Sequence, residues 1–150
     1  MTKVYLDNCC YNRPYDDQSQ LRISLETQAK LRIQDMIKDG EIELVSSYIL
    51  LYENSKNPYM LRQRTVRGFV EDYVSVYIDI DRSDEVKEIA ETIMKTGVKT
   101  ADAFHVACSI IAESDFFIST DDRLLKYQTE RVKLIDPVTF IREWEVSYEQ

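Results

Sequence analysis

The protein has 150 residues, of which 44% are hydrophobic and 31% are charged, with only three glycines and three prolines. This length fits one ordinary domain, residues 1–150, and the composition excludes disordered, collagen-like and coiled-coil chains. Three glycines do not suffice for the glycine-rich loops of Rossmann and P-loop nucleotide-binding proteins. Because 27 acidic residues outnumber 19 basic ones, giving a net charge of −8, the chain is also unsuited to clamp nucleic acid by overall charge. A nuclease that uses metal ions and a local basic patch is compatible with this balance.

The cysteines and the single histidine restrict the chemistry further. The three cysteines are Cys9, Cys10 and Cys108, and an odd, low count does not suit a secreted disulfide framework. One histidine, His105, leaves little for Ser-His-Asp catalysis or for a multi-histidine metal site. The first residues form no apolar signal core, and no stretch is long enough to span a membrane. We therefore expect a cytoplasmic protein without membrane contact, whose chemistry depends on carboxylates.

The first elements in chain order are a strand, a loop and a helix. Residues 4–6 form a short apolar run, which predicts a buried strand that ends at Asp7. The polar residues 8–18 predict a loop. Apolar residues then recur at helical spacing over residues 19–38 and predict a helix, and residues 42–46 predict the second strand.

The middle of the chain continues this alternation. Ser47 is placed to cap a helix over residues 48–53, and a second helix runs from Pro58 to about residue 72. Residues 74–80 alternate weakly and predict a third strand. Ser83 then caps a helix over residues 84–95.

The last third begins with a helix at Thr100, whose apolar face would comprise Ala101, Phe104, Ala107, Cys108 and Ile111. Strands are predicted over residues 116–119 and 132–135, and a helix over residues 137–146. Strands alternate with helices throughout, which predicts an α/β fold in three layers: a mostly parallel sheet of four to five strands with helices on both faces.

Four acidic residues stand at positions where carboxylates gather in α/β proteins. Asp7 and Asp121 each follow a buried strand, and ligands bind at the carboxyl ends of parallel strands. Glu53 shares a helical face with the apolar residues Ile49 and Leu50. Asp102 lies in the first turn of the helix that begins at Thr100.

Each of these residues also has a structural interpretation. Asp7 could begin a turn or satisfy backbone donors, and Asp121 could cap a short helix over residues 122–126. Glu53 could pair with Lys56 or Arg13, and Asp102 suits the first turn of any helix. Taken together, however, four converging carboxylates would repel one another without a cation, and oxygen ligands in this number favour Mg²⁺ or Mn²⁺. This convergence requires the Thr100 helix to begin at the same edge of the sheet.

With these segments in place, the chain resembles the PIN-domain family of metal-dependent ribonucleases. The matching segments are VYLDNCCYNRP, SSYILLYENSKNP, TGVKTADAFHVACSIIAESD and FFISTDDRLL, which together extend over essentially the whole chain. The resemblance implies that Asp7, Glu53, Asp102 and Asp121 are the catalytic residues and the metal ligands. Many members have Thr-Asn after the first aspartate, where this chain has Asn8-Cys9-Cys10, which suggests a divergent subgroup. Asp122, Ser119 and Asn8 are possible secondary site residues.

The resemblance also implies an activity and its partners. The expected activity is endonucleolytic cleavage of single-stranded RNA by a Mg²⁺- or Mn²⁺-dependent hydrolase. Asp7, Asp102 and Asp121 would hold the metal directly or through water, while Glu53 would hold or orient the attacking water. Small stand-alone members are commonly toxins of toxin–antitoxin pairs. We therefore expect a small antitoxin protein as partner, and a homodimer.

Several other residues admit both a functional and a structural interpretation. Arg62, Arg64 and Arg67 form the densest basic stretch and are candidates for nucleic-acid binding, although a solvated helix face is an equal alternative. Tyr11 and Tyr15 follow Asp7 closely and are candidates for base stacking. His105 follows Asp102 by one turn and is expected at the rim of the site. Zinc is disfavoured, because adjacent cysteines chelate one tetrahedral ion awkwardly, so all three cysteines are expected to be packing residues.

Two other classes of function are weighed against the nuclease. A phosphoryl-receiver signalling module needs two adjacent acids after the first strand, but Asn8 follows Asp7 here, and residues 74–81 fit its central strand poorly. A PIN-fold binding module without catalysis, or an RNA-processing factor, is the other alternative. The intact set of four acids favours the nuclease.

Overall fold

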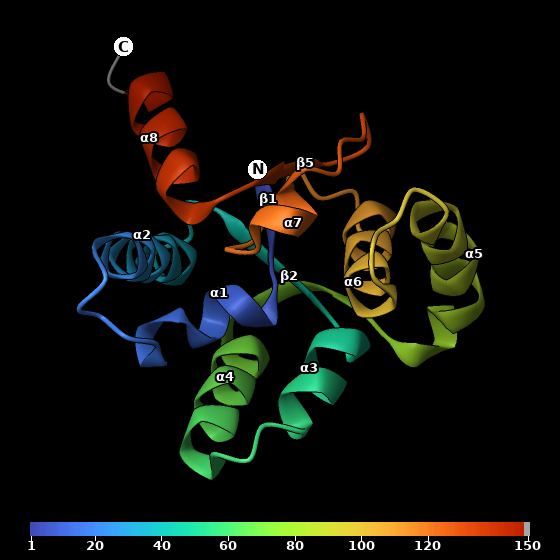
Figure 1. The fold of residues 1–150 in the computed structure, drawn as a ribbon, viewed down its shortest axis with the longest axis horizontal. Coiled ribbons are helices and arrows are strands. Elements are labelled where there is room, and N and C mark those ends of the chain that lie inside the picture. The colour runs from blue at the N-terminus through green and yellow to red at the C-terminus, as the bar shows by residue number, and fades with distance from the viewer. Residues whose placement is uncertain (149–150) are drawn as a thin grey trace.

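The apolar runs of the sequence form five parallel strands in one sheet. The computed structural model describes residues 1–148, and Figure 1 shows its fold. The strands are β1 (Lys3–Leu6), β2 (Glu43–Ser47), β3 (Val74–Ile78), β4 (Phe116–Ile118) and β5 (Lys133–Ile135). They lie in the order β3-β2-β1-β4-β5, and each neighbouring pair is parallel. The predicted α/β fold with a parallel central sheet is confirmed.

Side chains alternate between the two faces of the sheet, and each face is covered by its own helices. Along β1, Val4 and Leu6 join one buried apolar cluster, while Tyr5 joins the other. The first cluster lies under α1 (Asn8–Asn12), α2 (Leu21–Lys38), α4 (Met60–Tyr73) and α8 (Pro137–Tyr148). The second lies under α5 (Ser83–Met94) and α6 (Thr100–Ile111). In Figure 1 the sheet accordingly runs between α2 and α8 on the left and α5 and α6 on the right.

Besides α1, two short helices follow strands at the carboxyl edge of the sheet. The helix α3 (Tyr48–Ser55) leaves the carboxyl end of β2, with the Ser47 hydroxyl as its N-cap, as predicted. The helix α7 (Asp122–Leu125) follows β4 after a turn of three residues. Because all five strands are parallel, their carboxyl ends share this edge.

The order of the strands places the topological switch point of the sheet beside β1. The chain builds outward from β1 through β2 to β3, and then crosses back to β4 and β5 on the other side of β1. The topological switch point is therefore between β1 and β4, where open α/β sheets bind their ligands. Phosphoryl-receiver modules have the strand order 2-1-3-4-5, so this alternative does not fit the observed sheet.

The prediction of a loop over residues 8–18 was wrong in part. Residues 8–12 form α1, and Arg13–Tyr15 form a turn of 3-10 helix, η1. The Asp7 carboxylate caps α1 by accepting the N–H of Cys10 at 3.1 Å, and Arg13 anchors the turn by binding Glu26 at 2.8 Å. Cys10 and Tyr11 of α1 are buried in the core, but a helix of five residues is too short to show a helical repeat of apolar residues in the sequence.

Several predicted boundaries also differ from the structure. The third strand ends at Ile78 rather than residue 80, because Asp79 caps the 3-10 turn η2 (Ile80–Arg82). Pro58 lies before α4, which begins at Met60, and Ser83 is the first residue of α5 rather than its cap.

The buried face of α6 differs from the predicted one. Ala107 and Cys108 are buried as expected, but Ala101 is exposed, and Phe104 and Ile111 are only partly buried. The other buried residues of this helix are Ala103, His105, Val106, Ser109 and Ile110. Because α6 packs between the sheet and α5, its buried stripe is wider than one apolar face.

Among the helices within residues 1–148, none combines the length and the apolar composition that a membrane span requires.

Candidate active site

Asp7 lies at the switch point and is nearly inaccessible to solvent. It directly follows β1, and its N–H binds the carbonyl of Ile118 at the end of β4, at 3.3 Å. The residue is only 4% exposed. Burial raises the pKa of its carboxyl to about 6, a shift that the neighbouring Asp102 increases and a hydrogen bond with Ser119 partly offsets. Asp7 is thus both a helix cap and a buried acid facing other acids.

Asp121 stands on the other side of the switch point. It is the N-cap of α7, and one of its carboxylate oxygens, Oδ1, accepts the N–H groups of Arg123 and Leu124 at 2.9 and 3.3 Å. The Ser119 hydroxyl accepts the backbone N–H of Asp121 at 3.1 Å. Ser119 therefore links the two aspartates, because its hydroxyl also forms a hydrogen bond with Asp7.

Asp102 lies in the first turn of α6 and shares this edge of the sheet. It is partly buried, and its pKa is raised first by burial and then by the charge of Asp121, with a smaller contribution from Glu53. Asp102 lines one pocket with Arg123 and Leu124 of α7, the helix that follows β4, so α6 begins at the edge of the sheet where Asp121 stands.

Glu53 extends from α3 and is held by two hydrogen-bond donors. Its Oε1 accepts from the side-chain amide of Asn8 at 2.8 Å, and its Oε2 lies 3.2 Å from Nε2 of His105. Its pKa is lowered chiefly by the hydrogen bond with His105. The side chain is 42% exposed, so it reaches the surface rather than lying on a buried face. Neither Lys56 nor Arg13 is its partner.

The expected alternative partners of Glu53 have other contacts. Lys56 lies over the ring of Tyr52, 4.4 Å from its centre, and Arg13 binds Glu26 and Asp16.

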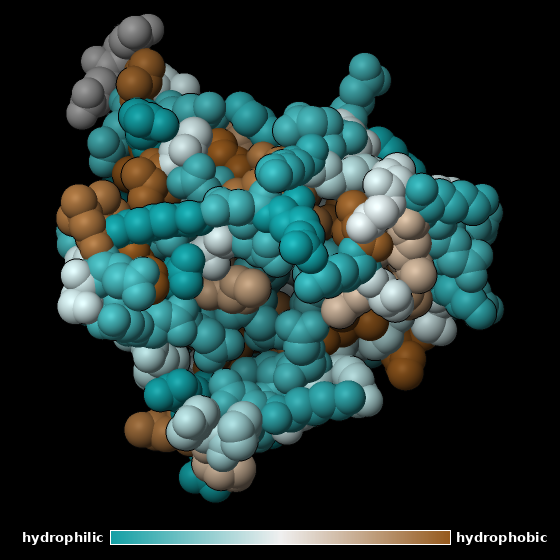
Figure 2. Space-filling view, viewed as in Figure 1, coloured by the Kyte–Doolittle hydropathy of each residue, from teal (hydrophilic) through white to brown (hydrophobic). Residues whose placement is uncertain are grey.

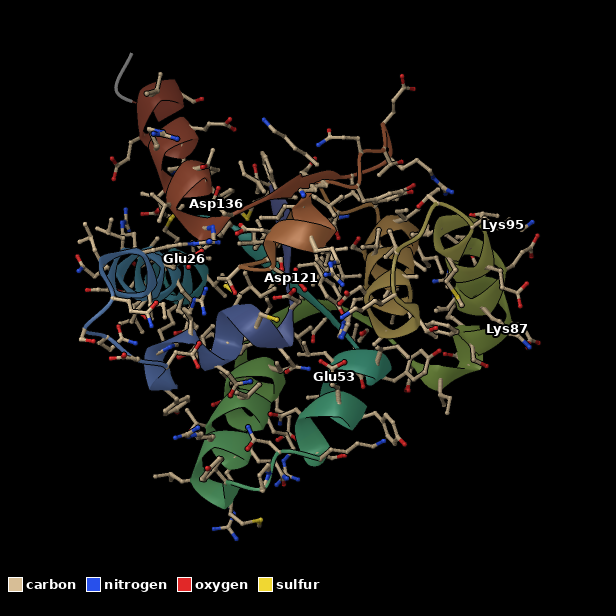
Figure 3. The ribbon with its side chains drawn as sticks, viewed as in Figure 1. Glu26, Glu53, Lys87, Lys95, Asp121 and Asp136 are labelled. Atoms are coloured by element: carbon tan, nitrogen blue, oxygen red, sulfur yellow. The ribbon has the colours of Figure 1, made fainter. Side chains whose placement is uncertain are left out.

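Figure 3 shows Glu53 and Asp121 in the middle of the molecule, between α1 and α6. The same region of the surface is mostly hydrophilic (Figure 2).

Asp122 binds Arg22 rather than facing the other acids. Both of its oxygens bind the guanidinium of Arg22 at 2.6 Å, which lowers the pKa of this exposed carboxyl. By contrast, Asn8 contacts Glu53, and Ser119 contacts both Asp7 and Asp121. The oxygen of the Asn8 side chain, Oδ1, is buried without a hydrogen-bond partner.

The donor chemistry of this site suits a hard divalent cation. Its acids present oxygen atoms only, and Asp7 and Asp102 have pKa values raised in part by neighbouring carboxylates, a repulsion that a cation would relieve. Among residues 1–148, however, no three His, Cys, Asp or Glu side chains stand close enough to enclose an ion by themselves.

The predicted basic stretch on α4 does not act as one patch. The guanidinium of Arg62 lies between two tyrosines, 4.7 Å from the ring centre of Tyr15 and 4.1 Å from that of Tyr59. Arg62 lines a pocket of about 380 Å³ that also contains Glu53. Arg67 instead pairs with Glu71 on its own helix, at 3.7 Å. Of the three arginines, Arg62 alone borders a carboxylate of the site.

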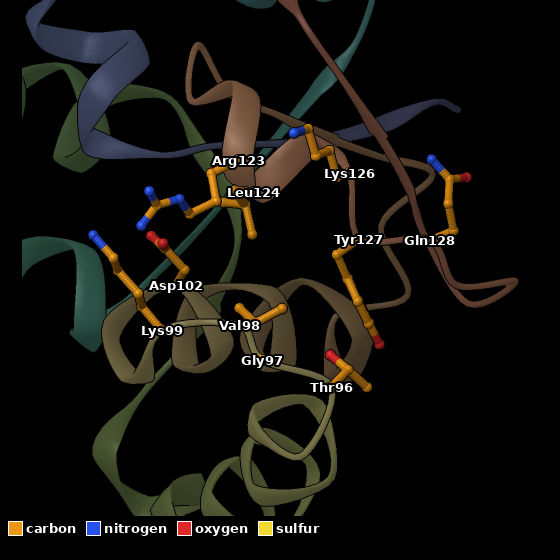
Figure 4. A pocket seen from close by; sticks show the side chains of 10 residues that line it. All are labelled: Thr96, Gly97, Val98, Lys99, Asp102, Arg123, Leu124, Lys126, Tyr127 and Gln128. Carbon is orange, nitrogen blue, oxygen red and sulfur yellow. The ribbon is translucent and has the colours of Figure 1, made fainter.

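A second basic group, which sequence reasoning missed, borders Asp102. Lys99, Arg123 and Lys126 line a pocket of about 340 Å³ together with Asp102. Figure 4 shows the Lys99 and Arg123 side chains extending on the same side as Asp102. These residues come from the start of α6 and from α7, and their only signal in the sequence is their closeness to Asp102 and Asp121.

The remaining candidate residues, a histidine, two tyrosines and three cysteines, differ in their burial. His105 is 2% exposed and lies beneath the site, so the prediction that it lines the rim was wrong. Tyr11 is buried in the core, which leaves Tyr15 as the accessible aromatic residue. Cys10 and Cys108 are buried as expected, whereas Cys9 is exposed, and all three cysteines are free thiols.

Comparisons with known proteins identify the fold. No protein-family model matches the sequence, and no curated protein is similar to it. The structure is similar to a crystal structure of VapBC2 from Rickettsia felis bound to a DNA fragment from their promoter, with a TM-score of 0.54. The two chains are 12% identical, and the match covers 90% of this chain and 98% of that one. At this identity the likeness shows the fold alone, and this chain therefore has a PIN-like α/β fold.

Proposed function

We propose that the protein is a metal-dependent endoribonuclease that cleaves single-stranded RNA. The observation that carries the proposal is that Asp7, Glu53, Asp102 and Asp121 lie toward the carboxyl edge of the sheet, where Asp102 raises the pKa of Asp7, and Asp121 and Glu53 raise the pKa of Asp102. The same four residues are those that the resemblance to PIN-domain ribonucleases selects. The shared fold supports this assignment.

The residues present fit Mg²⁺ or Mn²⁺. Asp7, Asp102 and Asp121 would hold the ion, and water would complete its coordination, since the acids do not enclose a site by themselves. When bound, such an ion lowers the pKa of water and neutralises negative charge on the phosphate under attack.

Side chains of the protein itself would orient the attacking water and bind the RNA. Glu53, kept ionised by its two donors, would orient the attacking water or accept its proton. Lys99 and Arg123 on one side and Arg62 on the other would bind phosphates that flank the scissile bond. This local arrangement provides positive charge in a chain whose net charge is −8.

We further propose that the protein is the toxin of a toxin–antitoxin pair and a homodimer in solution. The fold likeness to VapBC2 and the resemblance to small stand-alone PIN-domain toxins support this role. An acidic toxin suits a small antitoxin that inserts an arginine or lysine among the carboxylates. Leu21, Leu25 and Leu31 are exposed on α2 and offer apolar surface for an interface.

The test is cleavage of an end-labelled single-stranded RNA with Mg²⁺, with Mn²⁺ or with EDTA. Asp7→Asn is the site variant, and Asp72→Asn, an exposed acid on α4, is the matched control. We expect metal-dependent cleavage that the control retains and Asp7→Asn loses. Absence of cleavage, together with no change in melting temperature on adding metal, would instead favour the non-catalytic binding module.

A further inference from the structure

We propose that His105 is a positioning residue that fixes the carboxylate of Glu53 through a directed chain of hydrogen bonds from the interior of the sheet. What Glu53 then does rests on the proposed function, but the chain itself does not. The residues concerned are Ser47, Tyr5 and His105, all of them buried.

The contacts form an unbroken path. The N–H of Leu50 binds the Ser47 hydroxyl at 3.2 Å, and this hydroxyl lies 2.7 Å from that of Tyr5. The Tyr5 hydroxyl lies 2.7 Å from Nδ1 of His105, and Nε2 of the same ring lies 3.2 Å from Glu53. The path therefore leads from the N-terminus of α3 through the sheet and α6 back to a side chain of α3.

The middle of this path is rigid. The Tyr5 ring stacks on that of Phe117, with centres 5.2 Å apart and planes 9° from parallel, and it meets the His105 ring edge-on at 5.8 Å. Both aromatic neighbours are buried. A hydroxyl held in this way has one position from which it can contact His105.

For a neutral His105 ring, the contact with Glu53 determines the direction of the hydrogen bonds. In a neutral imidazole, one nitrogen donates and the other accepts. If Tyr5 donated to Ser47, Nδ1 would have to donate to Tyr5, and a bare Nε2 would face a carboxylate. The opposite direction satisfies every contact: Ser47 donates to Tyr5, Tyr5 donates to Nδ1, and the Nε2–H group donates to Glu53.

The consequence is that both oxygens of Glu53 are held, one from each side. Asn8, the residue after Asp7, donates to Oε1, and His105, one turn after Asp102, donates to Oε2. The helix spacing of three residues puts Asp102 and His105 on the same side of α6. The segments that contain Asp7 and Asp102 thus also hold the carboxylate of Glu53 in one orientation, facing the site.

The first test is nitrogen NMR of the histidine ring, which needs no activity. Because His105 is the only histidine, its two ring nitrogens are assigned without ambiguity. In mildly alkaline, metal-free buffer, we expect a protonated Nε2 and an unprotonated Nδ1. In Tyr5→Phe, which keeps the ring but removes the hydroxyl, we expect Nε2 to stay protonated because Glu53 still accepts from it, and the Nδ1 resonance to shift because this nitrogen loses its hydrogen-bond donor. A protonated Nδ1 in the wild-type protein, alone or with Nε2, would overturn the proposed direction.

The second test uses two amides that each imitate one ring nitrogen. Gln at position 105 can place an N–H group where Nε2 stands, whereas Asn reaches only the position of Nδ1. We expect His105→Asn to lower kcat about 10- to 100-fold with little change in KM, as for the loss of other residues that orient a ligand. His105→Gln should recover most of that loss. Equal losses in both variants, in step with their melting temperatures, would mean that His105 only packs.

The two tests separate this inference from the proposed function. If the wild-type protein cleaves no RNA but the ring has the expected tautomer, the hydrogen-bond chain stands and the nuclease proposal fails. If cleavage is metal-dependent but the tautomer is the opposite one, the nuclease stands and the positioning role fails.

Discussion

Arg22 on α2 binds Asp122, the first residue of α7, through both carboxylate oxygens, although one hundred residues separate the two in the chain. The same guanidinium contacts the carbonyl of Thr120 at 3.4 Å and Glu26 at 3.4 Å. The turn that follows β4 is thereby fixed on both sides of Asp121. This contact explains why only the first of two adjacent aspartates faces the site.

The first prediction separates these two aspartates. Asp121→Asn should reduce metal-dependent cleavage by about a hundredfold or more, because stabilisation of phosphate charge by a metal is worth several kcal/mol. Asp122→Asn should leave kcat within a few-fold, because it weakens only an exposed ion pair, worth about 1 kcal/mol or less. Single-turnover cleavage at saturating Mn²⁺ measures both. Equal losses in the two variants would contradict the assignment of Asp121.

The second prediction concerns RNA affinity. Replacing Lys99 and Arg123 with Gln should raise the dissociation constant for single-stranded RNA and flatten its dependence on salt, because each phosphate contact contributes to the salt slope. Arg67→Gln is the matched control, since Arg67 already pairs with Glu71. Fluorescence anisotropy of a labelled RNA, measured without metal at several salt concentrations, gives both quantities. An unchanged slope in the double variant would remove these residues from the binding surface.

Local patterns were sufficient to predict the framework of the fold. The apolar runs around Tyr5 and Phe117 are short and continuous, as in strands buried on both faces, and the regular alternation of strands with helices implies parallel pairing. The placement of Asp7 and Asp121 at one edge follows from that pairing, because each ends a parallel strand. Glu53 and Asp102 were candidates from their places in helices, which left the direction of their side chains open, and the resemblance to PIN domains joined them to the two aspartates.

What sequence could not predict depends on contacts between distant segments. The helix α1 has only five residues, too few for a helical repeat to be visible, and its contacts are with distant segments: Cys10 and Tyr11 pack into the core, and Arg13 after it pairs with Glu26. His105 has no local feature that distinguishes a rim residue from a buried one. Its role emerges only when Tyr5, one hundred residues away, is seen to contact it.

The third prediction follows from the crowding of acids around Asp7. Asn can still accept the N–H of Cys10 as a helix cap, but it removes a buried charge. In EDTA, Asp7→Asn should therefore melt at a higher temperature than the wild-type protein. Added Mn²⁺ should raise the melting temperature of the wild type alone, because binding to the folded state stabilises it. A similar Mn²⁺ shift in the variant would place the ion elsewhere.

The last prediction concerns Lys30, a buried lysine of α2 that lies away from the site. Its ammonium group lies 5.6 Å from the centre of the Tyr11 ring, and burial lowers its pKa from 10.5 to about 8. Because the unfolded chain binds more protons between these two pH values, stability should rise as pH increases from about 8 to 10.5. Below pH 8 the charged lysine carries a constant penalty of about 3 kcal/mol.

Lys30→Met, which keeps the length of the side chain, should remove this penalty. Urea unfolding should show a gain in stability of about 3 kcal/mol at neutral pH, and the gain should shrink toward zero as pH rises past 10.5. Lys87→Met, at an exposed lysine of α5, is the control and should show no such trend. A gain for Lys30→Met that is independent of pH would mean that better packing, rather than removal of a buried charge, stabilises the variant.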